Sequence, residues 1–297
     1  MAAVRRLSLA LTVVAWLLSW PAAAAIRVTD DTGAVIGLAA PARRIVSLAP
    51  HATELLFAAG AGAYVLGVLK GSDAPAQARS LPVIGDVNGL DLEGILALAP
   101  DLVVTWPYTT PGQVALLRAR GIAVFTTDAH RVDDIARDLE LLGTLAGTSD
   151  VAAKAAGDIR RRAGALAARA AGRRPVRVFY QVSSAPIFTI GGGHLIDRAL
   201  SECGGVNVFA DARIPAPQVD VEAVLARQPD VIVAATAGAR RPAWLDEWRA
   251  WPQLPAVRLD NLVVVDADRL HRAGPRFIDG MAQLCDALVR ARERMGG

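Results

Sequence analysis

The stretch DLEGILALAPDLVV at residues 91–104 recurs without a gap as DVEAVLARQPDVIV at residues 220–233. Each copy begins with an aspartate that can cap a helix, continues through two helical turns that a proline stops, and ends in an apolar run typical of a buried strand. Because one helix–strand unit occurs in both halves of the chain, the sequence predicts two lobes of one α/β design. The carboxyl ends of their parallel strands would face each other across a cleft, where such folds bind ligands.

The same alternation of elements continues outward from the two copies. Short apolar and β-branched runs predict buried strands at 44–48, 102–105, 123–126, 176–181, 231–233 and 262–265. Helical patterns lie between them at 53–59, 92–98, 113–120, 132–145, 195–203, 221–227 and 277–294. The repeated order of strand, helix and strand predicts an α/β protein with parallel sheets.

Residues 151–171 form an alanine-, arginine- and leucine-rich run without proline near the middle of the chain. At 1.5 Å per residue, such a run makes a single helix about 30 Å long. We interpret it as a helix that bridges two lobes, with an N-terminal lobe at 26–147, the bridge at 148–172 and a C-terminal lobe at 173–297. The alternative is an ordinary surface helix inside one continuous sheet.

The composition is that of a protein with a large core. The chain has 297 residues, 53% of them hydrophobic and 5% aromatic, and its formal net charge is +3. Intrinsic disorder, collagen-like repeats and a disulfide-dense miniprotein are therefore excluded. The charge is small and no basic block is interleaved with aromatic residues, so we expect no nucleic-acid partner.

The first 25 residues have the pattern of a secretory signal peptide. Two arginines precede an apolar run at 7–20, and four alanines at 22–25 supply the small residues that a signal peptidase reads. The apolar run is shorter than the roughly 20 residues that cross a bilayer, although an uncleaved anchor is the alternative. We expect cleavage near Ala24 or Ala25 and a nearly neutral mature chain, because the segment carries two arginines and no acid.

Export also decides how the two cysteines, Cys203 and Cys285, are interpreted. In an oxidising compartment an even pair most simply forms one disulfide, which here closes a loop of about 80 residues. Two buried free thiols are the alternative. Neither cysteine has the CxxC spacing of a redox or zinc site.

Signatures of catalysis are largely missing, since the chain contains no GxSxG, HExxH or GxxxxGK[ST] motif. The four histidines do not show metal-ligand spacing. His51 directly follows a predicted strand and His271 lies in a loop after the last one, so both are candidates to line the cleft, with a polar position without metal as the alternative. The glycine run at 191–193 predicts a tight strand-to-helix turn rather than a phosphate site.

Two aromatic and two acidic positions are further candidates. Trp106 follows the strand at 102–105, where a large flat side chain suits stacking on a flat ligand, and Phe188 near the glycine run is interpreted in the same way; simple packing is the alternative. Glu93 and Glu222 occupy the same place in the first helical turn of the two copies. An acid there complements the helix dipole, but two equivalent carboxylates, one per lobe, also suit docking onto a symmetric partner.

Several motifs together resemble a known family. They are RIVSLAPHATELLFAAG at 44–60, the segment at 92–101, CGGVNVF at 203–209, PQV at 217–219 with Glu222, and GPR at 274–276 with Cys285. These landmarks follow the family's order through nearly all of the mature chain. The sequence is similar to the periplasmic cobalamin-binding receptors of ABC importers, in the class III, helical-backbone metal-chelate receptor family.

The resemblance implies two Rossmann-like lobes joined by a rigid helix, with a corrinoid held between them, little hinge closure and no catalysis. It implies a disulfide between Cys203 and Cys285, and contacts of Glu93 and Glu222 with arginines on the two permease subunits of an inner-membrane ABC importer with its ATPase. The receptor is then a periplasmic monomer, and cobalamin is its cargo rather than a cofactor. The ligand contacts that we expect are His51, Trp106, Phe188, Asp268, His271 and Arg272.

The ligand pocket is where the sequence departs from this pattern. Other aromatic positions of well-known members fall on Gly71, Val87 and Ala216, so part of the stacking surface is replaced. Cobalamin leads as the ligand, with a cobinamide, haem or a ferric siderophore as alternatives in the same superfamily. The alternative from another class is a secreted α/β hydrolase that uses His51 or His271 as a general base, although no nucleophile can be paired with either histidine.

Overall fold

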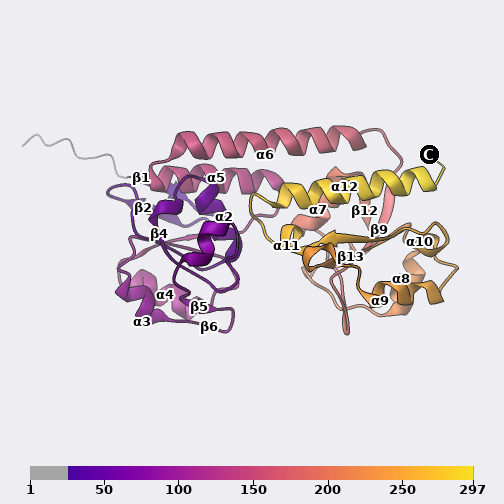
Figure 1. Cartoon of the computed structure of the whole chain (residues 1–297), viewed down its shortest axis with the longest axis horizontal. Coiled ribbons are helices and arrows are strands. Elements are labelled where there is room, and N and C mark those ends of the chain that lie inside the picture. Colours follow the sequence, from indigo (N-terminus) through magenta and orange to yellow (C-terminus); the bar gives the residue numbers. More distant parts are fainter. Residues whose placement is uncertain (1–25, 297) are drawn as a thin grey trace, which may run out of the picture.

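The computed structural model of the chain describes residues 26–296 and has two lobes, each built on a four-stranded parallel sheet (Figure 1). The strand order is β4-β3-β7-β8 in the N-terminal lobe and β12-β9-β13-β14 in the C-terminal lobe. This architecture confirms the predicted α/β class with two lobes and parallel sheets. The predicted signal peptide at residues 1–25 lies outside the described residues.

The N-terminal lobe contains, in chain order, β1 (Ile26–Thr29), β2 (Val35–Leu38), β3 (Ile45–Ser47), α2 (Pro50–Ala58), η1 (Gly62–Tyr64), β4 (Val65–Val68), η2 (Ala76–Ser80), β5 (Gly85–Asp86), β6 (Gly89–Leu90), α3 (Leu92–Ala97), β7 (Leu102–Thr105), α4 (Pro111–Ala119), β8 (Ala123–Thr126) and α5 (Val132–Ala146). The long helix α6 (Ser149–Ala170) follows it.

The C-terminal lobe contains β9 (Val176–Gln181), β10 (Ser183–Ser184), β11 (Ile187–Phe188), α7 (Leu195–Glu202), β12 (Gly205–Asn207), α8 (Val221–Arg227), β13 (Val231–Thr236), η3 (Ala237–Ala239), α9 (Ala243–Glu247), η4 (Trp248–Ala250), α10 (Pro255–Arg258), β14 (Leu262–Asp266), α11 (Ala267–Leu270) and α12 (Phe277–Arg294).

The two copies of the sequence repeat have the same local structure. Asp91 and Asp220 each cap their helix, α3 or α8, by accepting a hydrogen bond from the backbone N–H three residues later, at 2.8 and 2.7 Å. The ninth residue of each copy, Ala99 or Gln228, has a positive φ of 42° or 44°. Because even this uncommon backbone conformation is repeated, the two lobes share one design in detail.

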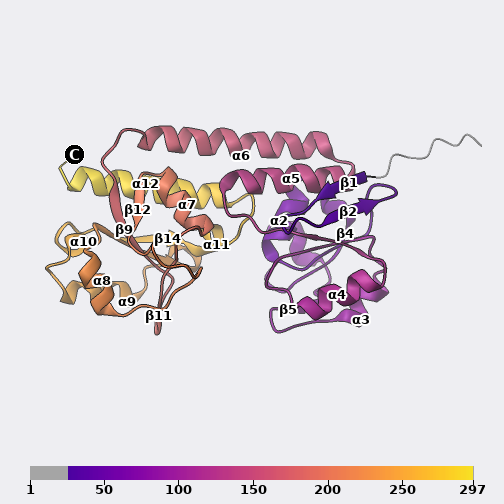
Figure 2. The ribbon, with the colours of Figure 1, turned by 180° about the vertical axis from the view of Figure 1, so that it is seen from behind.

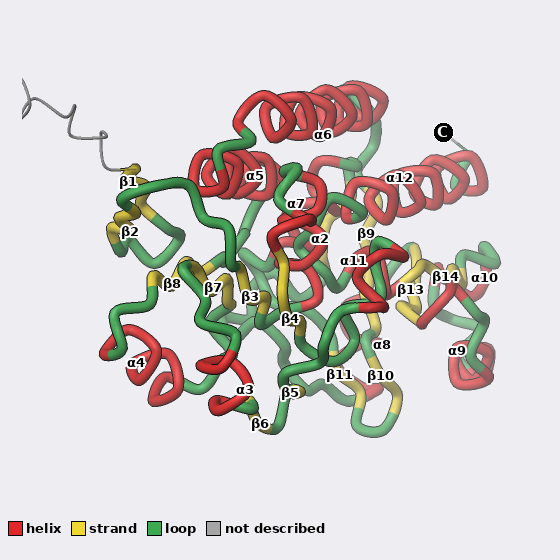
Figure 3. Tube along the Cα trace, turned by 60° about the vertical axis from the view of Figure 1, so that its left-hand side comes forward, coloured by secondary structure: helices red, strands yellow, loops and turns green. Residues whose placement is uncertain are grey.

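Helix α6 is the predicted bridge between the lobes. It packs on α5 in the N-terminal lobe and on α12 and α7 in the C-terminal lobe, and it runs over both lobes when seen from the front and from behind (Figures 1 and 2). Figure 3 shows α6 above α5 and α12. Ion pairs accompany this packing: Arg160 Nε lies 2.6 Å from Asp133 of α5, and Arg169 lies 2.7 Å from Asp286 of α12. One hydrophobic core runs from the N-terminal sheet along α5 and α6 into the C-terminal sheet, so the helix joins the lobes through buried contacts.

A second link between the lobes is ionic. Glu54 of α2 is 4% exposed and accepts two hydrogen bonds from Arg276, from Nε at 3.0 Å and from Nη2 at 2.7 Å. Arg272 lies 3.5 Å from Glu54 and 2.5 Å from Asp73. The loop that carries both arginines therefore ties the C-terminal lobe to the first helix after β3.

Cys203 and Cys285 form the expected disulfide, with their Cα atoms 4.8 Å apart. The bond joins the end of α7 to α12 inside the C-terminal lobe. The alternative interpretation of two buried free thiols is therefore wrong.

The start of helix α2 differs from the prediction, because the helix begins at Pro50 rather than at residue 53. A proline in the first helical turn has no N–H that the helix requires, and its fixed φ suits a helix start. His51 therefore lies on the first turn of a helix rather than in a loop. The two-residue strands of β5–β6 and β10–β11 and the β1–β2 hairpin were not predicted. Among residues 26–296, no helix combines the length and apolarity that a membrane span requires.

Candidate functional site

A cavity of about 420 Å³ lies between the lobes, where the carboxyl ends of strands from both sheets meet. Its walls come from the segments after β3, β7 and β8 in the N-terminal lobe, and from the glycine turn before α7 and the loop after α11 in the C-terminal lobe. Its lining includes three aromatic or hydroxyl side chains and four imidazoles, those of Trp106, Tyr108, Thr127, His51, His130, His194 and His271.

The N-terminal wall is built on His51 and Trp106. His51 is 7% exposed, and its Nε2 lies 2.9 Å from the hydroxyl of Thr127. That hydroxyl donates its hydrogen to the carbonyl of Thr105 at 3.1 Å, so Nε2 of His51 must be the donor to Thr127. The ring of Trp106 contacts His51 edge-on, with centroids 5.5 Å apart, and the ring of Tyr108 makes an edge-type contact with the same indole, with centroids 4.9 Å apart.

The C-terminal wall is built on His271 and His194. Nε2 of His271 lies 3.1 Å from the hydroxyl of Tyr180, a fully buried side chain. Burial raises the pKa of Tyr180 far above its usual range, so the phenol stays neutral. Nδ1 of His194 accepts a hydrogen bond from the N–H of Ile196 at 3.1 Å, which leaves Nε2 as the protonated nitrogen.

The glycine run at 191–193 is a close-packed turn. A Cβ on Gly191 would lie 2.1 Å from the carbonyl oxygen of Ile214, and one on Gly192 would lie 2.2 Å from that of Ala210. No side chain fits at either position. The run therefore forms the tight strand-to-helix turn that was predicted, and it positions His194 at the N-terminus of α7.

Burial keeps three of the four imidazoles of the cavity neutral near pH 7. It lowers the pKa of His51 to about 4, with a further contribution from the charge of Arg272. Burial also lowers the pKa values of His194 and His271. In the part of the chain that the structure describes, no three His, Cys, Asp or Glu side chains are grouped so that they could hold a metal ion. The histidines thus offer separate hydrogen-bonding groups around the cavity.

The structure brings together some of the predicted ligand contacts and not others. His51, Trp106 and His271 line the cavity. Phe188 lies in the β10–β11 hairpin and Asp268 in the first turn of α11, and neither is among the lining residues. The guanidinium of Arg272 forms ion pairs with Glu54 and Asp73. Contact of these three with a ligand stays a prediction.

Sequence reasoning did not place His130 and His194 in the site. Both nonetheless follow the rule that identified His51: His130 comes shortly after β8, and His194 follows the turn that leads from β11 to α7. Of the three positions where an aromatic residue is replaced, Ala216 lines the cavity, whereas Gly71 and Val87 lie outside its lining.

The two predicted docking residues are exposed and equivalent. Glu93 lies in the first turn of α3 and Glu222 in the first turn of α8. Both helices lie on the side of the molecule remote from α6, one in each lobe (Figures 1 and 2).

We expect His51 to make the stability of the protein depend on pH. The folded state keeps this ring neutral down to about pH 4, whereas the unfolded chain takes up a proton near pH 6.5. The unfolded state therefore binds more protons in this window, and the free energy of unfolding falls as the pH falls, by about 3 kcal/mol between pH 7 and pH 4.

The measurement is urea unfolding across this pH range for the wild-type chain and for His51→Gln. The contributions of the carboxylates cancel in the difference between the two chains. The variant should show the shallower dependence on pH, and parallel curves would contradict the assignment.

Comparison with known proteins finds a matching family model, a similar protein and similar solved structures. A family model described as periplasmic binding protein matches residues 45–269. A vitamin B12-binding protein of Vibrio cholerae serotype O1 is 40% identical over 256 residues, which cover 86% of this chain and 92% of the relative. The crystal structure of the periplasmic vitamin B12 binding protein BtuF of Vibrio cholerae matches with 40% identity and a TM-score of 0.78, covering 85% of this chain and 98% of that one.

A further solved structure is that of the periplasmic heme-binding protein RhuT from Roseiflexus sp. RS-1 in its apo form. It is 28% identical, with a TM-score of 0.72, and the match covers 84% of this chain and 98% of that chain. The two Vibrio proteins are thus named for vitamin B12 and the Roseiflexus protein for haem.

Proposed function

The chain belongs to the periplasmic binding protein family, and we propose that it captures a corrinoid, cobalamin, between its lobes in the periplasm and delivers it to an inner-membrane ABC importer. The observation that carries the proposal is 40% identity, over 86% of this chain, to a protein named for binding vitamin B12. As a receptor it binds and releases cobalamin as a monomer, without catalysis. Export would remove residues 1–25, with cleavage near Ala24 or Ala25.

The walls of the inter-lobe cavity have the chemistry that a flat ligand with polar edges requires. The half-buried indole of Trp106 supplies a flat apolar surface at the end of β7. The neutral imidazoles of His51, His194 and His271 supply hydrogen-bonding groups, which match the amide groups at the periphery of a corrin ring. Neutral imidazoles also avoid placing unpaired charge against the ligand.

Haem is the second candidate for the same cavity. It is favoured by the histidines, because a neutral imidazole is an iron ligand, and by the similarity to RhuT. Cobalamin ranks first because the identity to the vitamin B12-binding relative is 40%, against 28% to the haem-binding one.

Calorimetric titration of the mature chain with cyanocobalamin, haem and a ferric hydroxamate siderophore tests the choice. Saturable heat with cyanocobalamin alone is the expected result. Binding of haem with a shifted Soret band and no heat from cyanocobalamin would transfer the proposal to haem. No binding of any of the three would overturn both.

We expect Trp106→Ala to weaken cyanocobalamin binding about tenfold, because it removes an aromatic contact worth roughly 1.5 kcal/mol. Trp106→Phe keeps an aromatic face and should lose less than Trp106→Ala. The matched control is Trp244→Ala in α9, a half-buried tryptophan that does not line the cavity. Equal losses of cyanocobalamin affinity in Trp106→Ala and Trp244→Ala, measured by the same titration, would show that Trp106 does not contact the ligand.

A further inference from the structure

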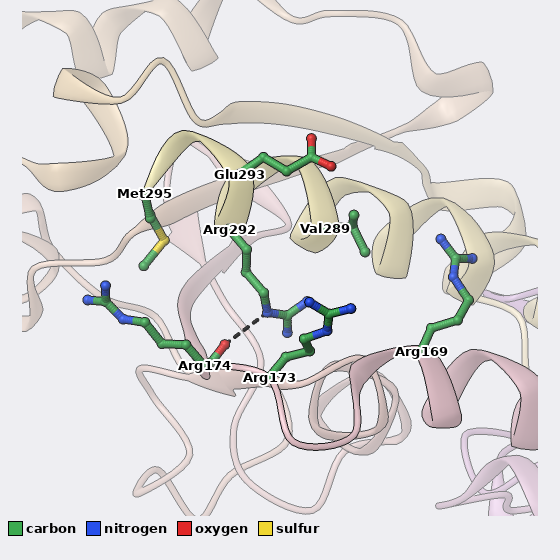
Figure 4. Close-up of a pocket in the computed structure, with 7 residues that line it drawn as sticks. All are labelled: Arg169, Arg173, Arg174, Val289, Arg292, Glu293 and Met295. Atoms are coloured by element: carbon green, nitrogen blue, oxygen red, sulfur yellow. Dashed lines mark hydrogen bonds between the residues drawn. The ribbon is translucent and has the colours of Figure 1, made fainter. Parts of the chain in front are cut away.

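A second cavity, of about 320 Å³, lies between the end of α6 and the end of α12 (Figure 4). It shares no lining residue with the inter-lobe cavity. Four of its seven lining residues are arginines. The lining consists of Arg169, Arg173, Arg174, Val289, Arg292, Glu293 and Met295.

Arg292 is a nearly buried cation whose partners are all neutral. It is 7% exposed, and its guanidinium donates to three backbone carbonyls, those of Arg174 at 2.8 Å, Cys203 at 2.9 Å and Gly204 at 2.8 Å. Gly204 leaves the room for this contact, since a Cβ there would lie 2.4 Å from Nη2 of Arg292. Within residues 26–296, Arg292 forms no ion pair with a carboxylate, so the protein orients its charge without neutralising it.

A second cation lies beside the first. The guanidinium groups of Arg173 and Arg292 are neighbours at the centre of the cavity (Figure 4), and after burial the charge of Arg173 is the next cause that lowers the pKa of Arg292. Within the described part of the chain, the side chains of Arg173 and Arg174 form no hydrogen bond or ion pair, and both residues are exposed.

The acidic groups nearby do not relieve this repulsion. Asp286 is paired with Arg169 at 2.7 Å. The carboxylate of Glu293 points away from the guanidinium groups (Figure 4). Like charges placed side by side raise the free energy of the protein, and a bound anion would lower it.

We propose that this cavity binds a multivalent oxyanion of the phosphate class. Planar guanidinium groups donate hydrogen bonds that fit phosphate oxygens, and in pairs where two of their nitrogens are unoccupied, as in Arg173 and Arg174. The three carbonyls occupy Nε and Nη2 of Arg292 and orient it, which leaves its Nη1 to donate to the anion. Val289 and Met295 give part of the wall an apolar surface, so the remainder of a phosphorylated molecule also fits. Because the site lies apart from both the inter-lobe cavity and the side that carries Glu93 and Glu222, it is independent of the ligand and of docking.

The test is calorimetric titration of the mature chain with sodium pyrophosphate at low ionic strength. The variant Arg173→Ala/Arg174→Ala removes two exposed side chains that form no hydrogen bond or ion pair within residues 26–296. The matched control, Lys154→Ala/Arg161→Ala, removes the same charge from exposed positions on α6. We expect saturable binding that weakens about tenfold in the site variant and less than about twofold in the control.

A second arm identifies the source of the phosphate. Vesicles of phosphatidylcholine with and without phosphatidylglycerol are sedimented with each chain. Pyrophosphate binding without sedimentation supports a soluble phosphate, and sedimentation that depends on phosphatidylglycerol and on Arg173 and Arg174 supports a lipid headgroup. No saturable binding of either probe, or equal losses in the site variant and the control, overturns the proposal.

Discussion

Replacement of both cysteines, Cys203→Ala with Cys285→Ala, is expected to lower the free energy of unfolding by about 4 kcal/mol. The bond joins residues 82 positions apart, and the closed loop contains β12, β13 and β14. Without it, the unfolded chain gains the entropy of that loop, whereas the folded chain keeps the packing of α7 and α12 on the sheet. Both cysteines are buried, so alanine is the substitution that introduces no unpaired polar group.

Urea unfolding of three samples measures the effect: the oxidised chain, the same chain reduced with dithiothreitol, and the double variant. The reduced chain and the double variant should lose comparable stability. The two lobes share one hydrophobic core along α6, so lowering the free energy of unfolding of the C-terminal lobe should move the transition of the whole chain. A loss below about 1 kcal/mol in both samples would show that the bond contributes little to folding.

The architecture was predictable because its evidence is local. The repeated copies at 91–104 and 220–233 carry their own caps, proline stops and apolar strands, and the structure reproduces each feature in both lobes. The short hairpins β5–β6 and β10–β11 have two residues per strand, too few for an alternating pattern to appear. The prediction placed the start of α2 at residue 53, because it followed the apolar pattern and did not count the proline at position 50 as part of the first helical turn.

Residues of the candidate site could be predicted only where their closeness to the end of a predicted strand indicated that they would line the cavity. His51, Trp106 and His271 follow strand ends in the sequence, and all three line the cavity. The pairing of Glu54 with Arg276 joins residues 222 positions apart, and no local pattern carries such a contact. Arg272 was predicted to contact the ligand, yet its partners in the structure are two carboxylates of the other lobe, a choice that depends on how the lobes pack.

The double variant Glu93→Ala with Glu222→Ala is expected to abolish uptake of labelled cyanocobalamin while leaving its binding unchanged. Each carboxylate is exposed at the same position of its lobe, so a two-subunit permease would meet one on each side. If each forms a hydrogen-bonded ion pair worth about 1.5 kcal/mol, their joint loss weakens docking about a hundredfold. The measurement is uptake by cells in which the variant is the only receptor, with calorimetry of the purified chain alongside.

The free energy of unfolding of the double variant distinguishes this docking role from a purely structural role, in which each glutamate only complements a helix dipole. That role is worth at most about 1 kcal/mol per site, so it predicts a small loss of stability and normal uptake. Single variants should show intermediate uptake, because one lobe would still be held. The matched control, Asp150→Ala with Asp158→Ala, removes the same charge from α6 on the opposite side and should transport normally. Wild-type uptake by the Glu93→Ala/Glu222→Ala chain, or equal loss in the control, would leave helix capping as the only role of the two glutamates.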